Sequence, residues 1–165
     1  MSLDNIQLSD QLCSILFSHN LIEDSTYNTI THSQKKFEIN SLGENQKKIL
    51  LLVNDPSYKF LPDDEMELLT NLVTACKLSI ADIALVNFNL NKYNYHQFND
   101  QFEPKKILVF GVTTAELELP FDIPYFQVQP FQEQLYLTAP YLKDFLNNTA
   151  LKKELWKSLQ KLFLE

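Results

Sequence analysis

The sequence contains no arginine and only two glycines, and both shortages limit the functions it can have. All 14 basic residues are lysines, so the chain lacks the planar guanidinium that reads guanine and holds phosphate in a bidentate manner. With Gly43 and Gly111 alone, a glycine-rich loop that cradles a nucleotide phosphate is not expected. The net charge of -7 adds long-range repulsion from nucleic acid and anionic membranes. We therefore expect no strong direct binding to nucleic acid.

Cysteine and histidine are also scarce, which limits metal and redox chemistry. Cys13 and Cys76 each lie in an apolar helical pattern, where a free thiol usually acts as a small buried hydrophobe. The three histidines, at positions 19, 32 and 96, lack the close spacing that zinc sites favour. The sequence therefore predicts no metal site, no cofactor and no structural disulfide, which fits the reducing cytoplasm.

Long apolar runs are missing as well. The first residues have no basic segment followed by an apolar core, and no run approaches the roughly 18 apolar residues of a membrane span. We expect a protein that is neither secreted nor inserted in a membrane. The 165 residues, 45% of them hydrophobic, contain no repeat or linker and predict one folded domain over residues 1–165.

Short apolar runs alternate with helical patterns along the chain. Residues 48–53, a lysine followed by five apolar residues, end in Asn54-Asp55-Pro56. Such a run is typical of a strand buried on both faces. The other predicted strands cover residues 80–88, 106–111 and 125–128. The predicted helices cover residues 3–18, a segment from about Pro62 to Cys76, and a segment from Asn148 or Thr149 to the C-terminus, with connections at 19–47 and 89–103. This order predicts a three-layer α/β/α sandwich with a central, mostly parallel, four-stranded sheet.

The loop after the first predicted strand is the first candidate site, because ligands of parallel sheets bind beyond the carboxyl ends of the strands. Asp55 could act there as a general base, with Tyr58 stacking on a planar ligand and Asn54 offering an amide. The structural alternative is an Asx-type turn made by the same Asn54 and Asp55. The residue types favour the turn, so no catalytic residue is assigned from this loop alone.

Aromatic residues supply candidates for binding a protein partner. The segment 88–102 is rich in tyrosine and phenylalanine but not basic, which favours a loop that covers the core or contacts a protein. A second aromatic group, residues 121–141, includes Tyr141 and is interrupted by prolines. Trp156 lies beside the apolar stripe of the last predicted helix, which indicates either a core residue or a half-buried interface residue.

Two segments resemble the psi subunit of bacterial DNA polymerase III, an accessory protein of the clamp loader. The first runs from Ile49-Leu50-Leu51-Leu52-Val53-Asn54-Asp55 through Val86. The second is Ala139-Pro140-Tyr141-Leu142-Lys143-Asp144, followed by Asn148, Ala150 and Leu155-Trp156. The resemblance implies a non-catalytic adaptor, since psi subunits pair with the chi subunit and dock on the clamp loader through their N-terminal segment. The predicted helix at 3–18 departs from that N-terminal pattern.

The same positions resemble uracil-DNA glycosylases, which share the three-layer architecture, more faintly. Residues 53–58 are similar to the Gly-Gln-Asp-Pro-Tyr-His segment of those enzymes. Leu137-Thr138-Ala139-Pro140 stands in place of their His-Pro-Ser-Pro segment, without the histidine that stabilises charge on the departing uracil. We therefore expect a non-catalytic interaction subunit whose partner is a chi-like subunit or the clamp loader, with Tyr58, Tyr141 and Trp156 as binding residues. The alternative is a divergent glycosylase-like enzyme in which Asp55 activates water.

Overall fold

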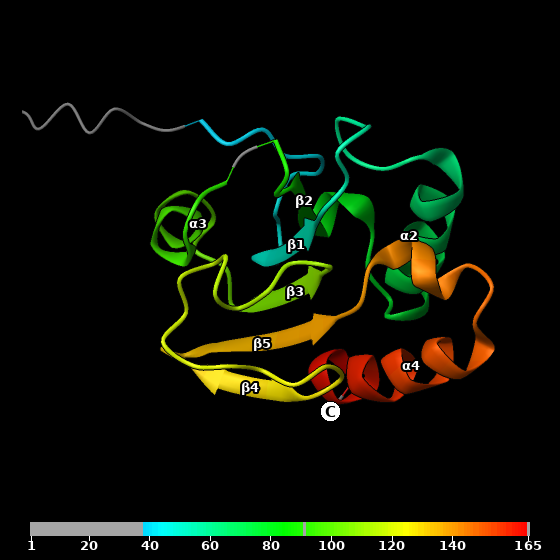
Figure 1. The fold of residues 1–165 in the computed structure, drawn as a ribbon. Coiled ribbons are helices and arrows are strands. Elements are labelled where there is room, and N and C mark those ends of the chain that lie inside the picture. The colour runs from blue at the N-terminus through cyan, green and yellow to red at the C-terminus, as the bar shows by residue number, and fades with distance from the viewer. Residues whose placement is uncertain (1–37, 91, 165) are drawn as a thin grey trace, which may run out of the picture. The chain divides into compact units, whose positions relative to one another are not determined.

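The structure is a computed structural model that describes residues 38–90 and 92–164 (Figure 1). The predicted helix at 3–18, most of the predicted connection at 19–47, and the residues Cys13, His19 and His32 lie outside the described residues. Within them, a five-stranded sheet with the order β2-β1-β3-β5-β4 is flanked by helices. The predicted α/β class with a mostly parallel sheet is confirmed, whereas the predicted number of four strands is wrong.

Four strands of the sheet run parallel, and the fifth closes one edge in the opposite direction. The parallel strands are β1 (Ile49–Val53), β2 (Ile83–Asn87), β3 (Lys106–Phe110) and β5 (Gln134–Ala139). The edge strand is β4 (Val128–Phe131), which pairs antiparallel with β5. All five residues of β1 are buried, as expected for a central strand covered on both faces.

The last two strands were predicted only in part. The predicted strand at 125–128 overlaps β4 by one residue, and β5 was not predicted at all. The sequence did not indicate the turn between β4 and β5. Gln132 and Glu133, with φ of 48° and 63°, occupy turn positions where a hairpin usually has asparagine or glycine. Pro130 is tolerated in β4 because an edge strand leaves one side of its backbone unpaired.

A second difference concerns the two segments that flank β2. The strand predicted at 80–88 is β2, which begins at Ile83, three residues later than predicted. The residues before it, Ile80–Asp82, form a 3-10 turn in which Asp82 accepts from the Ser79 backbone N–H at 2.8 Å. The predicted connection at 89–103 contains helix α3 (Tyr95–Phe102). This helix was missed because it has only two turns, started by the reciprocal capping of Asn94 and Gln97.

The two remaining helices match the prediction closely. Helix α2 (Asp63–Ala75) begins after Pro62 with three acidic residues in its first turn, which suit the positive end of the helix dipole. Helix α4 (Thr149–Phe163) is capped by Asn148, whose side chain accepts from the Leu151 backbone N–H at 3.1 Å. Cys76, predicted as a buried free thiol, is free and buried, and burial raises its pKa.

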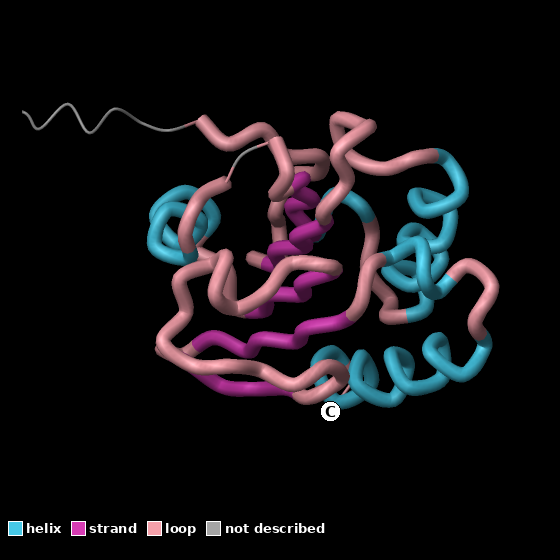
Figure 2. The backbone as a smooth tube through the Cα atoms, in the orientation of Figure 1, coloured by secondary structure: helices cyan, strands magenta, loops and turns pink. Residues whose placement is uncertain are grey.

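Helices cover both faces of the sheet. Alternate residues of β1 point to opposite faces, so Leu51 packs on the side of α2 and α4, whereas Leu50 and Leu52 pack on the side of α3. Figure 2 shows α3 on one side of the strands and α2 with α4 on the other. The two apolar clusters hold the sheet rigid and leave its two ends, where strands enter and leave, as the places for polar groups.

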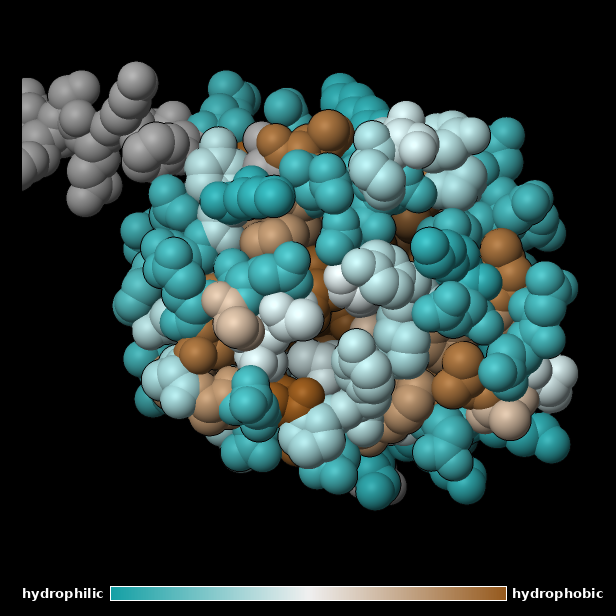
Figure 3. All heavy atoms as spheres, viewed as in Figure 1, coloured by the Kyte–Doolittle hydropathy of each residue, from teal (hydrophilic) through white to brown (hydrophobic). Residues whose placement is uncertain are grey.

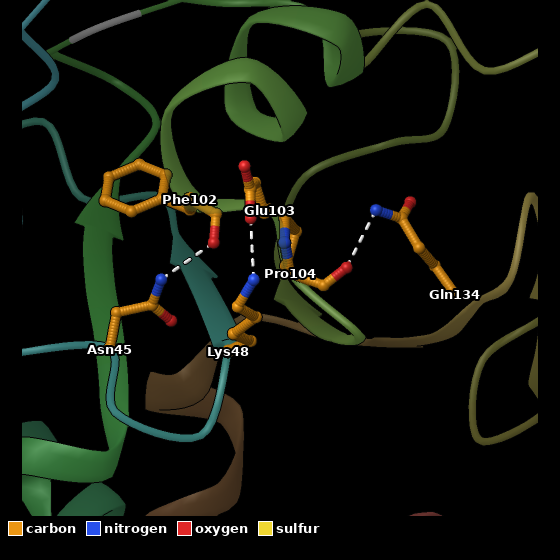
Figure 4. A network of polar contacts seen from close by, with 6 residues as sticks. All are labelled: Asn45, Lys48, Phe102, Glu103, Pro104 and Gln134. Carbon is orange, nitrogen blue, oxygen red and sulfur yellow. Dashed lines mark hydrogen bonds and ion pairs between the residues drawn. The ribbon is translucent and has the colours of Figure 1, made fainter.

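A polar network fastens the amino end of the sheet (Figure 4). The Asn45 side chain donates to the Phe102 carbonyl at 2.8 Å, and Gln134 donates to the Pro104 carbonyl at 2.8 Å. Between them, Lys48 forms an ion pair with Glu103 at 2.6 Å. These contacts tie the segment after α3 to the chain before β1 and to the start of β5.

Candidate functional site

The carboxyl ends of β1, β2, β3 and β5 meet at one edge of the sheet, where they frame a pocket of about 250 Å³. The segment after β1, residues 54–56, forms one wall, and Asn89 follows β2. Tyr141 and Lys143, which follow β5, form another wall, and Glu65 comes from the first turn of α2. This is the place where parallel sheets bind ligands, because the loops that leave neighbouring strands converge there.

The Asp55 carboxylate shapes the loop after β1. Its Oδ1 atom accepts hydrogen bonds from the backbone N–H groups of Ser57 at 2.7 Å and Tyr58 at 3.1 Å. This is the Asx-type turn that the sequence favours. Among the residues that the structure describes, no hydrogen bond to the Oδ2 atom is present. Asp55 lines the pocket, so this second oxygen is available to accept a hydrogen bond from a ligand.

Asn87, at the end of β2, holds the same loop to the sheet through hydrogen bonds. Its Oδ1 atom accepts from the backbone N–H groups of Asp55 and Asn89, each at 3.1 Å. Its Nδ2 atom donates to the carbonyls of Asp55 at 2.7 Å and Tyr58 at 2.8 Å. The side chain is 2% exposed, so one buried amide satisfies four backbone groups and fixes the loop relative to the sheet.

Asn54 links the chain segments that follow β1, β2 and β3. Its Nδ2 atom donates to the Gly111 carbonyl at 2.9 Å, and its Oδ1 atom accepts from Asn89 Nδ2 at 3.0 Å. Gly111 directly follows β3, and Asn89 follows β2. The amide of Asn54 is therefore committed to holding neighbouring loops together.

Gly111 is required by the close approach of Tyr141. Its φ is +66°, a left-handed conformation, and a Cβ atom there would lie 2.4 Å from Cδ1 of Tyr141. Because glycine alone adopts this backbone without steric cost and leaves room for the ring, the Tyr141 ring rests against the backbone after β3. Tyr141 is still 41% exposed, so it packs against the backbone on one side and remains accessible on the other.

Glu65 is a buried acid in the pocket. It is 8% exposed, and among the described residues no hydrogen bond or ion pair engages its carboxylate. Burial raises the pKa of Glu65, and the negative charge of Asp55 raises it further. The ammonium of Lys143 acts in the opposite direction on that pKa, while Asp144 adds to the increase.

Lys143 supplies the only positive charge among the described residues that line the pocket. Its Nζ atom lies over the Tyr141 ring, 5.0 Å from the ring centroid, in a cation–π arrangement. It forms no ion pair with either acid of the pocket wall, and the ion pairs of the described residues are Lys47–Asp82 and Lys48–Glu103. Two carboxylates and one ammonium leave the lining with an excess of negative charge when all three are ionised.

The residues singled out from the sequence are only partly brought together. Asn54, Asp55 and Tyr141 line the pocket. Tyr58 belongs to the same loop and is 52% exposed, but it is not among the lining residues. Trp156 lies on α4, half-buried against the apolar cluster on that side of the sheet, and it does not line the pocket either.

Sequence reasoning did not assign Glu65, Asn87 or Lys143 to the site. Glu65 is in the first turn of α2, where the helix dipole favours an acid whichever way it points, so nothing in the sequence indicates which side of the helix it faces. Asn87 did carry a signal, since it is an amide at the carboxyl end of an apolar strand. Lys143 belonged to the segment that resembles psi subunits, but that resemblance did not assign it a contact.

A second pocket, of about 410 Å³, opens at the amino end of the sheet. Lys47, Lys77, Lys105 and Lys106 line it around an apolar floor that includes Ile49 and Phe163. Lys47 is paired with Asp82, and Lys106 lies over the Phe163 ring at 5.0 Å. The described part of the chain thus separates its charges, with lysines around this pocket and an excess of acids in the one at the carboxyl end.

Within residues 38–90 and 92–164, no helix is both long and apolar enough to cross a membrane. No cluster of three or more potential His, Cys, Asp or Glu metal ligands is present in that same part of the chain. The chain matches no model of a known protein family, and comparison with curated proteins found no match either.

Proposed function

We propose that this chain is a non-catalytic protein-interaction subunit of a cytoplasmic replication assembly, similar in kind to the psi subunit of DNA polymerase III. Its partner in this proposal is a chi-like subunit or the clamp loader, and the carboxyl edge of the sheet is the contact surface. The helices on both faces of the sheet support the related inference of a three-layer α/β/α sandwich, the architecture that psi subunits share with uracil-DNA glycosylases.

One observation carries the proposal. Each of the two sequence segments that resemble psi subunits contributes residues to the same pocket, and these residues lie about 85 positions apart in the chain. Asn54 and Asp55 come from the first segment, and Tyr141 and Lys143 come from the second. A binding surface shared with psi subunits would place residues of both resembling segments at one site.

The surface itself has the composition of a protein interface. Tyr58 and Tyr141, 52% and 41% exposed, are large and amphipathic side chains of the kind that dominate binding energy at interfaces. Each is held by its loop, Tyr58 through the Asp55 turn and Tyr141 through Gly111. On the face shown in Figure 3, hydrophobic residues form small patches among hydrophilic ones, so we expect specificity to depend on such polar and aromatic groups.

Co-purification of the tagged full-length chain from its native organism, followed by mass spectrometry, tests the proposal. Recovery of a clamp-loader or chi-like subunit is the expected result. Tyr141→Ala should reduce that recovery strongly, whereas Tyr125→Ala should not, because Tyr125 is 53% exposed but does not line the pocket. Recovery of no replication protein, or equal loss in both variants, would contradict the proposal.

The pocket also favours one alternative, a divergent glycosylase-like enzyme acting on DNA bases. Asp55, whose Oδ2 atom accepts no hydrogen bond from the described residues, lines a space of about 250 Å³, large enough for a nucleobase and a water molecule. Release of uracil from single-stranded DNA, lost in Asp55→Asn and retained in the exposed control Asp63→Asn, would favour the enzyme over the adaptor. Asp55→Asn keeps an Oδ1 acceptor for the turn, so the comparison isolates the carboxylate charge.

A further inference from the structure

We propose that the pocket at the carboxyl edge binds the guanidinium group of an arginine on a protein partner. This inference rests on the proposed function, since it names the chemical group by which a partner would engage that edge.

The carboxylate of Glu65 is the main reason. The residue is 8% exposed and lines an open pocket, yet among the described residues no donor is hydrogen-bonded to its oxygens. Because these oxygens are not among the fully enclosed side-chain atoms, they can be reached from the pocket, while burial of the rest of the residue leaves the ionised carboxylate short of donors and of compensating positive charge. A ligand with N–H donors and a positive charge would supply both.

The position of Lys143 indicates the sign of the ligand's charge. Its ammonium lies over the Tyr141 ring at 5.0 Å and lowers the pKa of Glu65 through its charge, but it does not reach the carboxylate. The chain therefore already places a cation in the lining of this pocket, but that cation forms no ion pair with Glu65. An incoming cation would displace Lys143 from the ring and complete the contact.

The shape and chemistry of the walls favour arginine over other cations. Tyr141 offers an exposed aromatic surface on which a planar guanidinium can stack, and the carboxylates of Glu65 and Asp55 can accept its fork of N–H groups. A lysine ammonium lacks that plane and that fork. The chain contains no arginine of its own, so the guanidinium must come from another molecule.

The experiment titrates the full-length chain with N-acetyl-arginine N-methylamide as the probe. Binding is measured by ¹H–¹⁵N NMR of the side-chain amides of Asn54 and Asn89. Shifts with the arginine probe, and none with the uncharged isostere N-acetyl-citrulline N-methylamide, are expected. Glu65→Gln should weaken binding about tenfold or more, because the buried acceptor charge is removed. Glu67→Gln, an exposed acid on the same helix that does not line the pocket, should leave binding unchanged.

Lys143→Met separates this proposal from its opposite. If Lys143 competes with the ligand's cation, its removal should tighten arginine binding several-fold, whereas Lys153→Met on the exposed surface of α4 should not. Weaker arginine binding in Lys143→Met, or binding unaffected by Glu65→Gln, would overturn the inference. Dispersed NMR spectra of each variant verify that it is folded.

The two proposals fail in different ways. Replication-partner recovery that is lost in Tyr141→Ala but intact in Glu65→Gln would remove the arginine inference and leave the proposed function standing. Arginine-probe binding that depends on Glu65, without any replication partner, would remove the proposed function and leave an arginine-binding pocket for a different protein.

Discussion

Replacing Asn87 by alanine should destabilise the protein strongly, because this side chain connects the candidate site to the sheet. The substitution removes two hydrogen bonds to Asp55, one to Asn89 and one to Tyr58. The site is 2% exposed, so solvent cannot replace all four partners without movement of the loop. At about 1 kcal/mol of net stability per bond, the expected loss in free energy of unfolding is about 3 to 4 kcal/mol.

Urea denaturation followed by the fluorescence of the single tryptophan, Trp156, measures that loss, because its half-buried ring packs against the apolar core. Asn89→Ala is the matched control, since Asn89 is exposed and its side chain makes one hydrogen bond, to Asn54. We expect that control to lose about 0.5 kcal/mol or less. A loss below about 1.5 kcal/mol in Asn87→Ala, or similar losses in both variants, would refute the assignment of Asn87 as the anchor of the loop.

Three further predictions concern Gly111, Glu65 and the N-cap residue Asn148. Gly111→Ala should lower the free energy of unfolding by about 1 to 2 kcal/mol because of its φ of +66°, and further because the new Cβ atom displaces the Tyr141 ring. Adding Tyr141→Ala should therefore restore part of the stability. Thermal denaturation measures both effects, and a Gly111→Ala protein as stable as the unchanged chain would contradict the prediction. The folded-state pKa of Glu65 is raised above its usual value of 4.5, so stability from its neutral form is present below pH 4.5 and lost as the pH rises through the folded-state pKa. Glu65→Gln should therefore be more stable than the unchanged chain at pH 7, with the difference vanishing in acid and absent in Glu67→Gln. A less stable Glu65→Gln in urea titrations at pH 7 would show the sign to be wrong. Asn148→Ala should cost about 1 kcal/mol through loss of the α4 cap, whereas calorimetry of the neighbouring Asn147→Ala should show little change.

The fold was largely predictable wherever a single local pattern dominated. The continuous apolar run at Ile49–Val53 predicted a central strand, and the cap and apolar stripe of α4 predicted its start at Asn148 or Thr149. Prediction failed where local patterns were weak. β5 mixes polar and apolar residues, and its hairpin turn at Gln132 and Glu133 lacks the usual glycine or asparagine.

The candidate site was predictable only in part. The rule that ligands bind at the carboxyl ends of parallel strands indicated Asn54 and Asp55, and the structure places both at the pocket. It could not indicate Glu65, because the face that a first-turn residue of α2 presents depends on how that helix packs against the sheet. Tyr141 was singled out as an aromatic residue, but its partner Gly111 was not.

The sequence by itself determined the class of fold, since alternating apolar runs and amphipathic segments can bury their apolar residues only as helices packed on a sheet. It also determined the acidic net charge and the absence of arginine, which are properties of composition. Only the tertiary structure decided that Asp55, Glu65 and Tyr141 share one pocket. That decision depends on strand order and helix packing, which arise from contacts between residues far apart in the chain and leave no mark in any short stretch of sequence.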